Sequence, residues 1–258
     1  MRQKNNVGNM GHWELLLFFF VVAFIYSSVG FGGGSSYLAI LSLYHLPVAD
    51  IKLTALTCNI IVVAGSSILF IRNGQVNFRK ILPVVMLSVP MAYLGGKLPL
   101  SEKVFFITLG ASLLAASVLL WIKTRATEPE ATTHRANDYV KDGLIGGGIG
   151  FLSGMVGIGG GIFLSPILNL MRWDAAKKIA ATAAIFILVN SISGIAGQLS
   201  KGIGAVNYTQ TGLLCAAVLL GGQIGSRIGI SKFNPLAVRR VTAVLVFAAG
   251  VEVLIKHL

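Results

Sequence analysis

Long apolar segments are the feature that most constrains how this chain can fold. A helix needs about 20 mostly apolar residues to cross a hydrocarbon core of about 30 Å, because each helical residue rises about 1.5 Å. In lipid every backbone N–H and C=O must be paired within the segment, and barrel strands are shorter and alternate in polarity. The sequence therefore predicts an all-α integral membrane protein from eight apolar segments: 13–46, 54–71, 81–98, 104–122, 143–171, 179–199, 209–230 and 236–255.

The composition agrees with this class and disfavours several others. Charged residues make up 12% of the chain and mean hydropathy is +0.79, whereas soluble domains carry about 25% charged residues. The net charge of +12 comes from Lys and Arg scattered between the apolar segments, as in loops that set membrane orientation, so no nucleic-acid partner is expected. Cys58 and Cys215 stand alone within apolar segments and are expected to pack in the core. No Ser/His/Asp set or metal cluster is visible, so we expect no catalytic residues, metal or cofactor.

The chain is built from two copies of one pattern. VGFGGG at 29–34 matches VGIGGG at 156–161, a spacing of 127, and GQVNF at 74–78 matches GAVNY at 204–208, a spacing of 130. Lys97 and Arg227 also fall at equivalent points. The repeats predict a first membrane unit over 1–122, a polar linker over 123–141 and a second membrane unit over 142–258.

The first segment of each copy is too long for one ordinary span. Segment 13–46 has glycines at its centre, and each costs about 1 kcal/mol relative to alanine inside a helix, so a break is predicted there. If each long segment is a hairpin followed by three transmembrane helices, Lys and Arg divide 14 to 7 between the two faces; single spans give 11 to 10. The positive-inside rule thus favours hairpins, inverted halves, a cytoplasmic linker and periplasmic termini. The alternative, which the sequence leaves open, is that each long segment crosses the membrane once as a kinked helix.

The glycine-rich breaks are the strongest candidates for function. A helix that restarts inside a membrane leaves its first N–H groups without intrahelical partners, and its positive dipole end can hold an anion. The alternative is that glycines only allow close helix packing, which we expect for Gly150 and Gly154 and for Gly221, Gly225 and Gly229. The candidate substrate-binding residues at the breaks are Gly32, Gly33, Gly34, Ser35, Ser36, Gly159, Gly160 and Gly161.

Polar side chains within the segments form a second group of candidates, because an unpaired amide is costly in lipid. Substrate contact and hydrogen bonding between helices are both open for them. Lys97 and Arg227 are expected to draw an anion towards the two mouths, or to reach lipid headgroups. No acidic residue falls at a segment centre, which disfavours a cation pathway. The second group consists of Thr54, Thr57, Asn59, Thr182, Asn190 and Gln223.

These motifs resemble the sulfite exporter TauE/SafE family of bacterial permeases, also called TSUP. The resemblance rests on the paired VGxGGG runs at 29–34 and 156–161, the paired turns at 74–78 and 204–208, and the polar central linker. It implies transport of sulfur-containing anions such as sulfite, sulfoacetate or related sulfonates across the bacterial inner membrane. We expect an alternating-access permease with a midplane site at the breaks, in the lipid bilayer. A passive anion channel and a non-transporting scaffold subunit are the alternatives. The sequence leaves open the exact substrate, the direction, any coupling ion and the oligomeric state.

Overall fold

The computed structural model describes residues 13–28, 30–44, 46–122, 136–200, 208–232 and 235–257. Within them the regular secondary structure consists of ten helices, because the glycine breaks split segments 13–46 and 143–171 into two helices each, as predicted. The helices are α1 (Trp13–Ser27), α2 (Gly34–Ser42), α3 (Val48–Arg72), α4 (Phe78–Lys97), α5 (Glu102–Trp121), α6 (Ala136–Val156), α7 (Gly161–Leu170), α8 (Ala176–Leu199), α9 (Tyr208–Lys232) and α10 (Pro235–His257).

The boundaries follow local signals in the sequence. Gly74 has φ +65°, and the side chain of Asn77 accepts a hydrogen bond from the Lys80 amide at 3.4 Å, so the first predicted turn ends α3 and caps α4. Helix α6 begins at Ala136, which makes the last six residues of the predicted 123–141 linker helical. The rest of that linker and residues 204–207 of the second predicted turn lie outside the described residues.

Among the described residues, five helices are long and apolar enough to cross a membrane: α3, α4, α5, α8 and the part of α9 from Thr209 to Ile228. Two shorter apolar helices, α1 and α7, border the glycine breaks. The apolar windows of α3 and α8 are 56% and 61% buried, whereas those of α4 and α9 are 28% and 33% buried. The bundle therefore has α3 and α8 at its centre, with α4 and α9 at its periphery.

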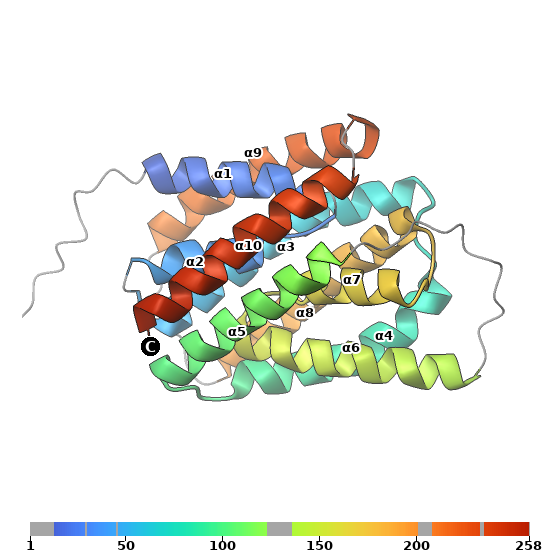
Figure 1. Cartoon of the computed structure of the whole chain (residues 1–258), viewed down its shortest axis with the longest axis horizontal. Coiled ribbons are helices and arrows are strands. Elements are labelled where there is room, and N and C mark those ends of the chain that lie inside the picture. Colours follow the sequence, from blue (N-terminus) through green and yellow to red (C-terminus); the bar gives the residue numbers. More distant parts are fainter. Residues whose placement is uncertain are drawn as a thin grey trace, which may run out of the picture.

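The two halves make equivalent contacts with each other. Helix α4 packs against α6 as α9 packs against α1, and these pairs lie at opposite edges of the bundle (Figure 1). Helix α2 packs against α10 as α7 packs against α5. Helices of each half thus pack against helices of the other half at equivalent places.

The equivalent helices of the two halves run antiparallel where they meet. Gln198 near the end of α8 donates to the Ala49 carbonyl at the start of α3 over 2.7 Å. His257 at the end of α10 stacks on Phe106 near the start of α5, with ring centroids 3.6 Å apart. Arg239 near the start of α10 donates to the Leu119 carbonyl near the end of α5.

Glycines spaced four residues apart allow the peripheral helices to approach closely. Gly150 and Gly154 of α6 face the backbone of α4, and Gly221 and Gly225 of α9 face the backbone of α1. This confirms the packing role expected for these four glycines.

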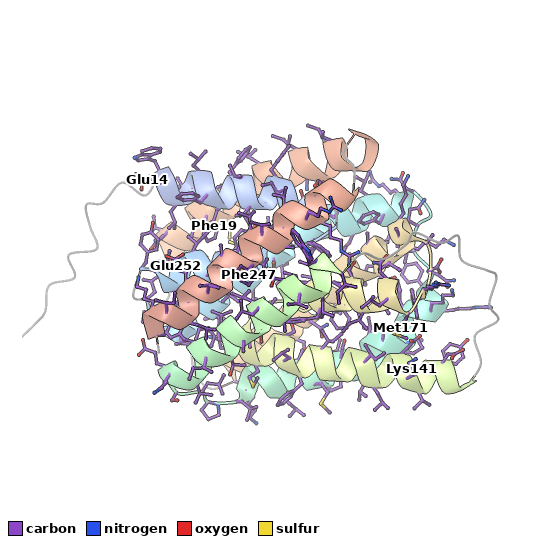
Figure 2. The ribbon with its side chains drawn as sticks, in the orientation of Figure 1. Glu14, Phe19, Lys141, Met171, Phe247 and Glu252 are labelled. Carbon is purple, nitrogen blue, oxygen red and sulfur yellow. The ribbon has the colours of Figure 1, made fainter. Side chains whose placement is uncertain are left out.

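Large apolar side chains cover much of the outer surface, including Leu82 and Met86 of α4 and Phe247 of α10. Glu14 and Glu252 lie towards one end of the bundle and Lys141 towards the other (Figure 2). An apolar side wall with charges towards the ends is the arrangement that a bilayer requires.

Substitutions at two glycines of α6 test the close packing of α6 against α4. A Cβ at Gly150 would lie 2.8 Å from the Ser88 Cα, whereas a Cβ at Gly148 would meet nothing within 4 Å. We expect Gly150→Ala to destabilise the protein by roughly 1–3 kcal/mol through overpacking. Gly148→Ala should be neutral or slightly stabilising. Thermal unfolding in detergent measures both, and equal melting temperatures would contradict the close α4–α6 contact.

Candidate functional site

The first break ends α1 through a glycine in the left-handed region. Gly30 has φ +81°, its amide donates to the Ser27 carbonyl at 3.1 Å, and the Phe31 amide donates to the Tyr26 carbonyl at 2.9 Å. These two bonds form a Schellman motif, which requires positive φ at the glycine. The helix therefore stops inside the bundle with its last carbonyls partly satisfied.

The chain then restarts as α2. Gly33 has φ +87° and its carbonyl accepts hydrogen bonds from the amides of Ser36 and Tyr37, both at 3.0 Å. The amides of Gly34 and Ser35 precede the first intrahelical bond, so the helix itself does not use them. The arm folds back on α1: the rings of Phe19 and Tyr37 stack with centroids 4.6 Å apart.

The second break repeats this geometry. Gly157, Gly159 and Gly160 all have positive φ, and the Gly160 carbonyl accepts from the amides of Phe163 and Leu164 at 3.1 Å. The amides of the first two residues of α7 are therefore also left over by the helix. Both restarts lie where the sequence placed them.

One hollow is shared by the two breaks. Its empty volume is about 190 Å³, of which only about 10 Å³ can take the centre of a water-sized molecule. The hollow is small, with room for little more than one water. Its lining consists of Tyr26, Phe31, Gly32, Gly33, Gly34, Ser35, Ile158, Gly161, Ile162 and Ile187.

Asn59 of α3 joins the two breaks. Its side-chain amide donates to the Ile158 carbonyl of the second break at 3.0 Å, and the side chain is fully buried. A Cβ on Gly32, Gly34 or Gly159 would collide with it. These three glycines are thus needed for Asn59 to fit between the breaks.

Hydroxyl groups lie at the first-half side of the hollow. The Tyr26 hydroxyl is 2.7 Å from Ser36 Oγ and 3.4 Å from Ser35 Oγ. Of the predicted break residues, Gly32, Gly33, Gly34, Ser35 and Gly161 line the hollow directly, while Ser36, Gly159 and Gly160 lie in the adjoining turns.

None of the predicted polar residues outside the breaks lines this hollow, although Asn59 lies between the two breaks. Thr54 Oγ1 lies 3.3 Å from Thr211 Oγ1 of α9, an interhelical contact. Thr57 and Thr182 donate to carbonyls of their own helices. Gln223 contacts Gly65.

Asn190, Lys97 and Arg227 also lie away from the lining. Asn190 is fully buried, and neither atom of its amide has a hydrogen-bond partner among the described residues. Lys97 and Arg227 are exposed, near the ends of α4 and α9. Their expected role at the mouths stays a prediction.

Sequence reasoning missed Tyr26, Ile158, Ile187 and Lys52. Lys52 is only 4% exposed, and its Cβ and Cγ lie against Gly157, where a Cβ would be 3.2 Å from Cγ. The signal for Lys52 was present, because it is a cation one turn into an apolar helix. Ile158 and Ile187 carry no such signal.

Comparison with known proteins decides the family. The model of the family described as "Sulfite exporter TauE/SafE" matches residues 15–253. The chain belongs to the sulfite exporter TauE/SafE family. It is 33% identical to the probable membrane transporter protein y4hK of Sinorhizobium fredii, over 93% of this chain and 97% of the relative.

More distant relatives show the same extent of similarity. The chain is 24% identical to the probable membrane transporter protein YdhB of Bacillus subtilis, over 90% of this chain and 94% of the relative. It is 23% identical to the probable membrane transporter protein MJ0441 of Methanocaldococcus jannaschii, over 93% and 94% respectively. No solved structure matches the chain. The apolar helices and these relatives make it a multi-pass membrane protein of a transporter family.

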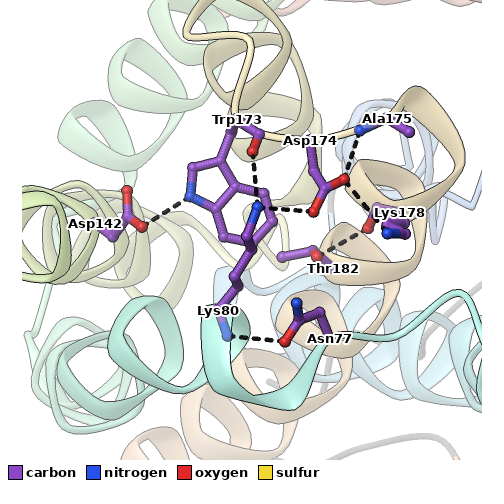
Figure 3. Close-up of polar contacts among 8 residues, drawn as sticks. All are labelled: Asn77, Lys80, Asp142, Trp173, Asp174, Ala175, Lys178 and Thr182. Carbon is purple, nitrogen blue, oxygen red and sulfur yellow. Dashed lines mark hydrogen bonds and ion pairs between the residues drawn. The ribbon is translucent and has the colours of Figure 1, made fainter. Parts of the chain in front are cut away.

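At one end of this TauE/SafE family protein, a polar cluster ties the halves together (Figure 3). Lys80 of α4 forms an ion pair with Asp174, in the connection between α7 and α8, over 3.0 Å. Its ammonium also donates to the Trp173 carbonyl at 3.4 Å and lies 5.4 Å from the centre of the Trp173 ring. The Trp173 indole N–H donates to Asp142 of α6 at 2.8 Å.

The charge of Asp174 is stabilised by its neighbours. Burial acts to raise the pKa of this carboxyl, but the Ala175 amide, at 2.8 Å, and the Lys80 ammonium outweigh it, and Lys178 adds to their effect. The net result is a pKa below the usual value. The ion pair is therefore present at neutral pH.

Asp174→Asn should reveal this contribution through its pH dependence. The pKa of Asp174 is lower in the folded state than in the unfolded state. The stabilisation from its charge is therefore fully present above the unfolded-state pKa of about 3.9, and it is lost as pH falls through the folded-state pKa. We expect the variant to be less stable than wild type at pH 7 by roughly 1–3 kcal/mol, with the difference closing below about pH 4. Melting curves against pH measure this. Glu102→Gln, at an exposed position, is the control and should follow wild type; a gap for Asp174→Asn that does not change with pH would refute the ion-pair role.

Proposed function

We propose that this protein is a permease for small sulfur-containing anions, and that the anion binds in the hollow between the two glycine breaks. The observation that carries the proposal is that breaks from two separate halves meet at one hollow, and each restarts a helix there. Helix N-termini present unbonded N–H groups and a positive dipole end, which together favour an anion.

The charges near the hollow support an anion over a cation. Its lining includes no carboxylate, while Tyr26 and Ser35 offer hydroxyl donors. Lys52 is buried against the second break and adds positive charge nearby. A cation would meet the positive ends of two helices without a compensating acid.

The class of anion is inferred from the family and from the residues that line the hollow. The family is described by sulfite export, which makes sulfite, sulfoacetate and related sulfonates the first substrates to test. The wall contributed by the second half is apolar, with Ile158, Ile162 and Ile187. An anion with a short carbon chain, such as an alkylsulfonate, would place that chain against the isoleucines and its oxygens against the amides.

The small size of the hollow favours alternating access over a passive channel. The space for the centre of a water-sized molecule is about 10 Å³, so the helices must move apart for an ion to fit. The antiparallel meetings of α3 with α8 and of α5 with α10 support inverted halves, and inverted repeats can rock against each other around a fixed site. We place the Lys80 and Asp174 end, where the basic-rich connections gather, in the cytoplasm of a bacterial inner-membrane protein.

Purified protein in liposomes tests the proposal directly. We expect wild type to move at least one of sulfite, thiosulfate, an alkylsulfonate and sulfoacetate, and Gly33→Leu combined with Gly160→Leu to reduce that flux at least about tenfold. The leucines would force side chains onto positions with φ +87° and +84° that border the hollow. Labelled anion uptake over time is the measurement.

Gly212→Leu is the matched control, since a Cβ there meets nothing within 4 Å. Its flux should equal wild type. Unchanged flux in the inserted double variant would exclude the breaks as the site. Movement only down a gradient, whatever proton or sodium gradient is imposed, would favour a channel, and no movement of any anion in the panel would favour a scaffold subunit.

Lys52 should matter for affinity more than the charges at the ends. We expect Lys52→Met to weaken anion binding about tenfold, equivalent to about 1.4 kcal/mol, because it removes a buried positive charge beside the second break. Lys97→Met and Arg227→Met, at exposed positions, should change affinity less than threefold. Calorimetric titration with the transported anion compares them, and an equal loss in all three variants would show that the effect is long-range attraction alone.

A further inference from the structure

The two cysteines of the chain meet across the two halves. Cys58 lies on α3 of the first half and is fully buried, and Cys215 lies on α9 of the second half and is half-buried. Their side chains are close enough to interact. They are the only cysteines in the sequence, and they are 157 positions apart. From the sequence each cysteine is predicted only to pack in the core, because no short motif joins the two.

The register of α3 and α9 independently places the pair face to face. One turn before the cysteines, Thr54 Oγ1 of α3 lies 3.3 Å from Thr211 Oγ1 of α9. Beyond them, a Cβ at Gly222 would lie 3.5 Å from the Val62 Cα, so the two backbones approach closely. A disulfide needs Cα atoms about 4.4–6.8 Å apart, which calls for close neighbours of this kind.

We propose that Cys58 and Cys215 form a reversible disulfide under oxidising conditions and are a redox modification site of this protein. A hydroperoxide is the oxidant. The sulfur of one cysteine, as thiolate, attacks the peroxide, breaks the O–O bond and becomes a sulfenic acid, with release of water or an alcohol. The other thiol attacks that sulfur and displaces a second water. In total two thiols lose two electrons and two protons, and a small thiol returns them by exchange.

The more exposed sulfur is the one that the oxidant reaches. Cys215 is half-buried, whereas Cys58 is covered completely, so Cys215 takes the first step and Cys58 resolves it. The pair therefore has both an attacking and a resolving member, which a single buried thiol lacks.

The disulfide would act on the site through Asn59. Cys58 directly precedes Asn59, the residue that joins the two breaks, and Cys215 is on the opposite half. A covalent link there would hold α3 against α9 and prevent the halves from moving past each other. This consequence rests on the proposed function, whereas formation of the disulfide does not.

The chemical step is tested on the purified full-length protein in liposomes with hydrogen peroxide. We expect wild type to lose two mass units and both maleimide-reactive thiols, and a small thiol to restore them. Cys58→Ser and Cys215→Ser are the matched controls, and neither should form an internal disulfide. Both thiols remaining reactive with maleimide in denaturant after peroxide, or oxidation that stops at sulfenic or higher acids, would overturn the redox pair.

The transport step uses the same samples. We expect oxidised wild type to lose at least about tenfold of its anion flux and to recover it with a small thiol, while Cys215→Ser keeps its flux under peroxide. A complete disulfide with unchanged flux would overturn the locking role and leave the modification site established. If wild type moves no anion before oxidation, the proposed function fails, and the mass measurement still decides the disulfide.

Discussion

The whole arrangement depends on satisfying backbone polar groups where two helices stop inside an apolar bundle. Hydrocarbon offers no hydrogen bonds, so each carbonyl and amide at a break needs a partner from the protein or from a ligand. The first break satisfies its own carbonyls through Gly30 and Phe31. The second break depends on the other half, because Asn59 binds the Ile158 carbonyl. What remains unused by the helices is a set of amides at the start of α2 and α7, and these amides are the basis of the proposed anion site.

Glycine patterns in the sequence were enough to predict the breaks, because the information is local. Glycine permits the positive φ found at Gly33 and Gly160, and the restarts occur within a residue or two of the expected place. The side chains that complete the hollow could not be predicted in the same way. Ile187 is an ordinary apolar residue whose role comes only from where α8 crosses the breaks. Conversely, Thr182 looked equally suited from the sequence, yet its hydroxyl is used by its own helix.

The two halves share a backbone plan but differ in the side chains at equivalent places. Gly30 meets Ala180, and its counterpart Gly157 meets Lys52, which lies 128 positions before Ala180. By the same offset Asn59 corresponds to Ile187, and both contact the glycines that begin the adjoining short helix. The first half thus contributes the amide, the buried cation and the hydroxyls, and the second contributes the apolar wall. A duplicated fold therefore produces a site with one polar and one apolar side, which a symmetric pair of breaks alone would not.

The two halves also differ in the polar contacts that they make at the charged end of the bundle. The Lys80 and Asp174 ion pair joins α4 of the first half to the second half, and the position equivalent to Lys80, 130 residues later, is Gln210. Separating the halves at that end would break this ion pair, whose Asp174 side chain is only 5% exposed, and would cost roughly 1–3 kcal/mol. If the halves rock around the hollow, the ion pair therefore opposes opening at the charged end. Low pH or high salt weakens such a pair, and either would shift the balance towards that opening.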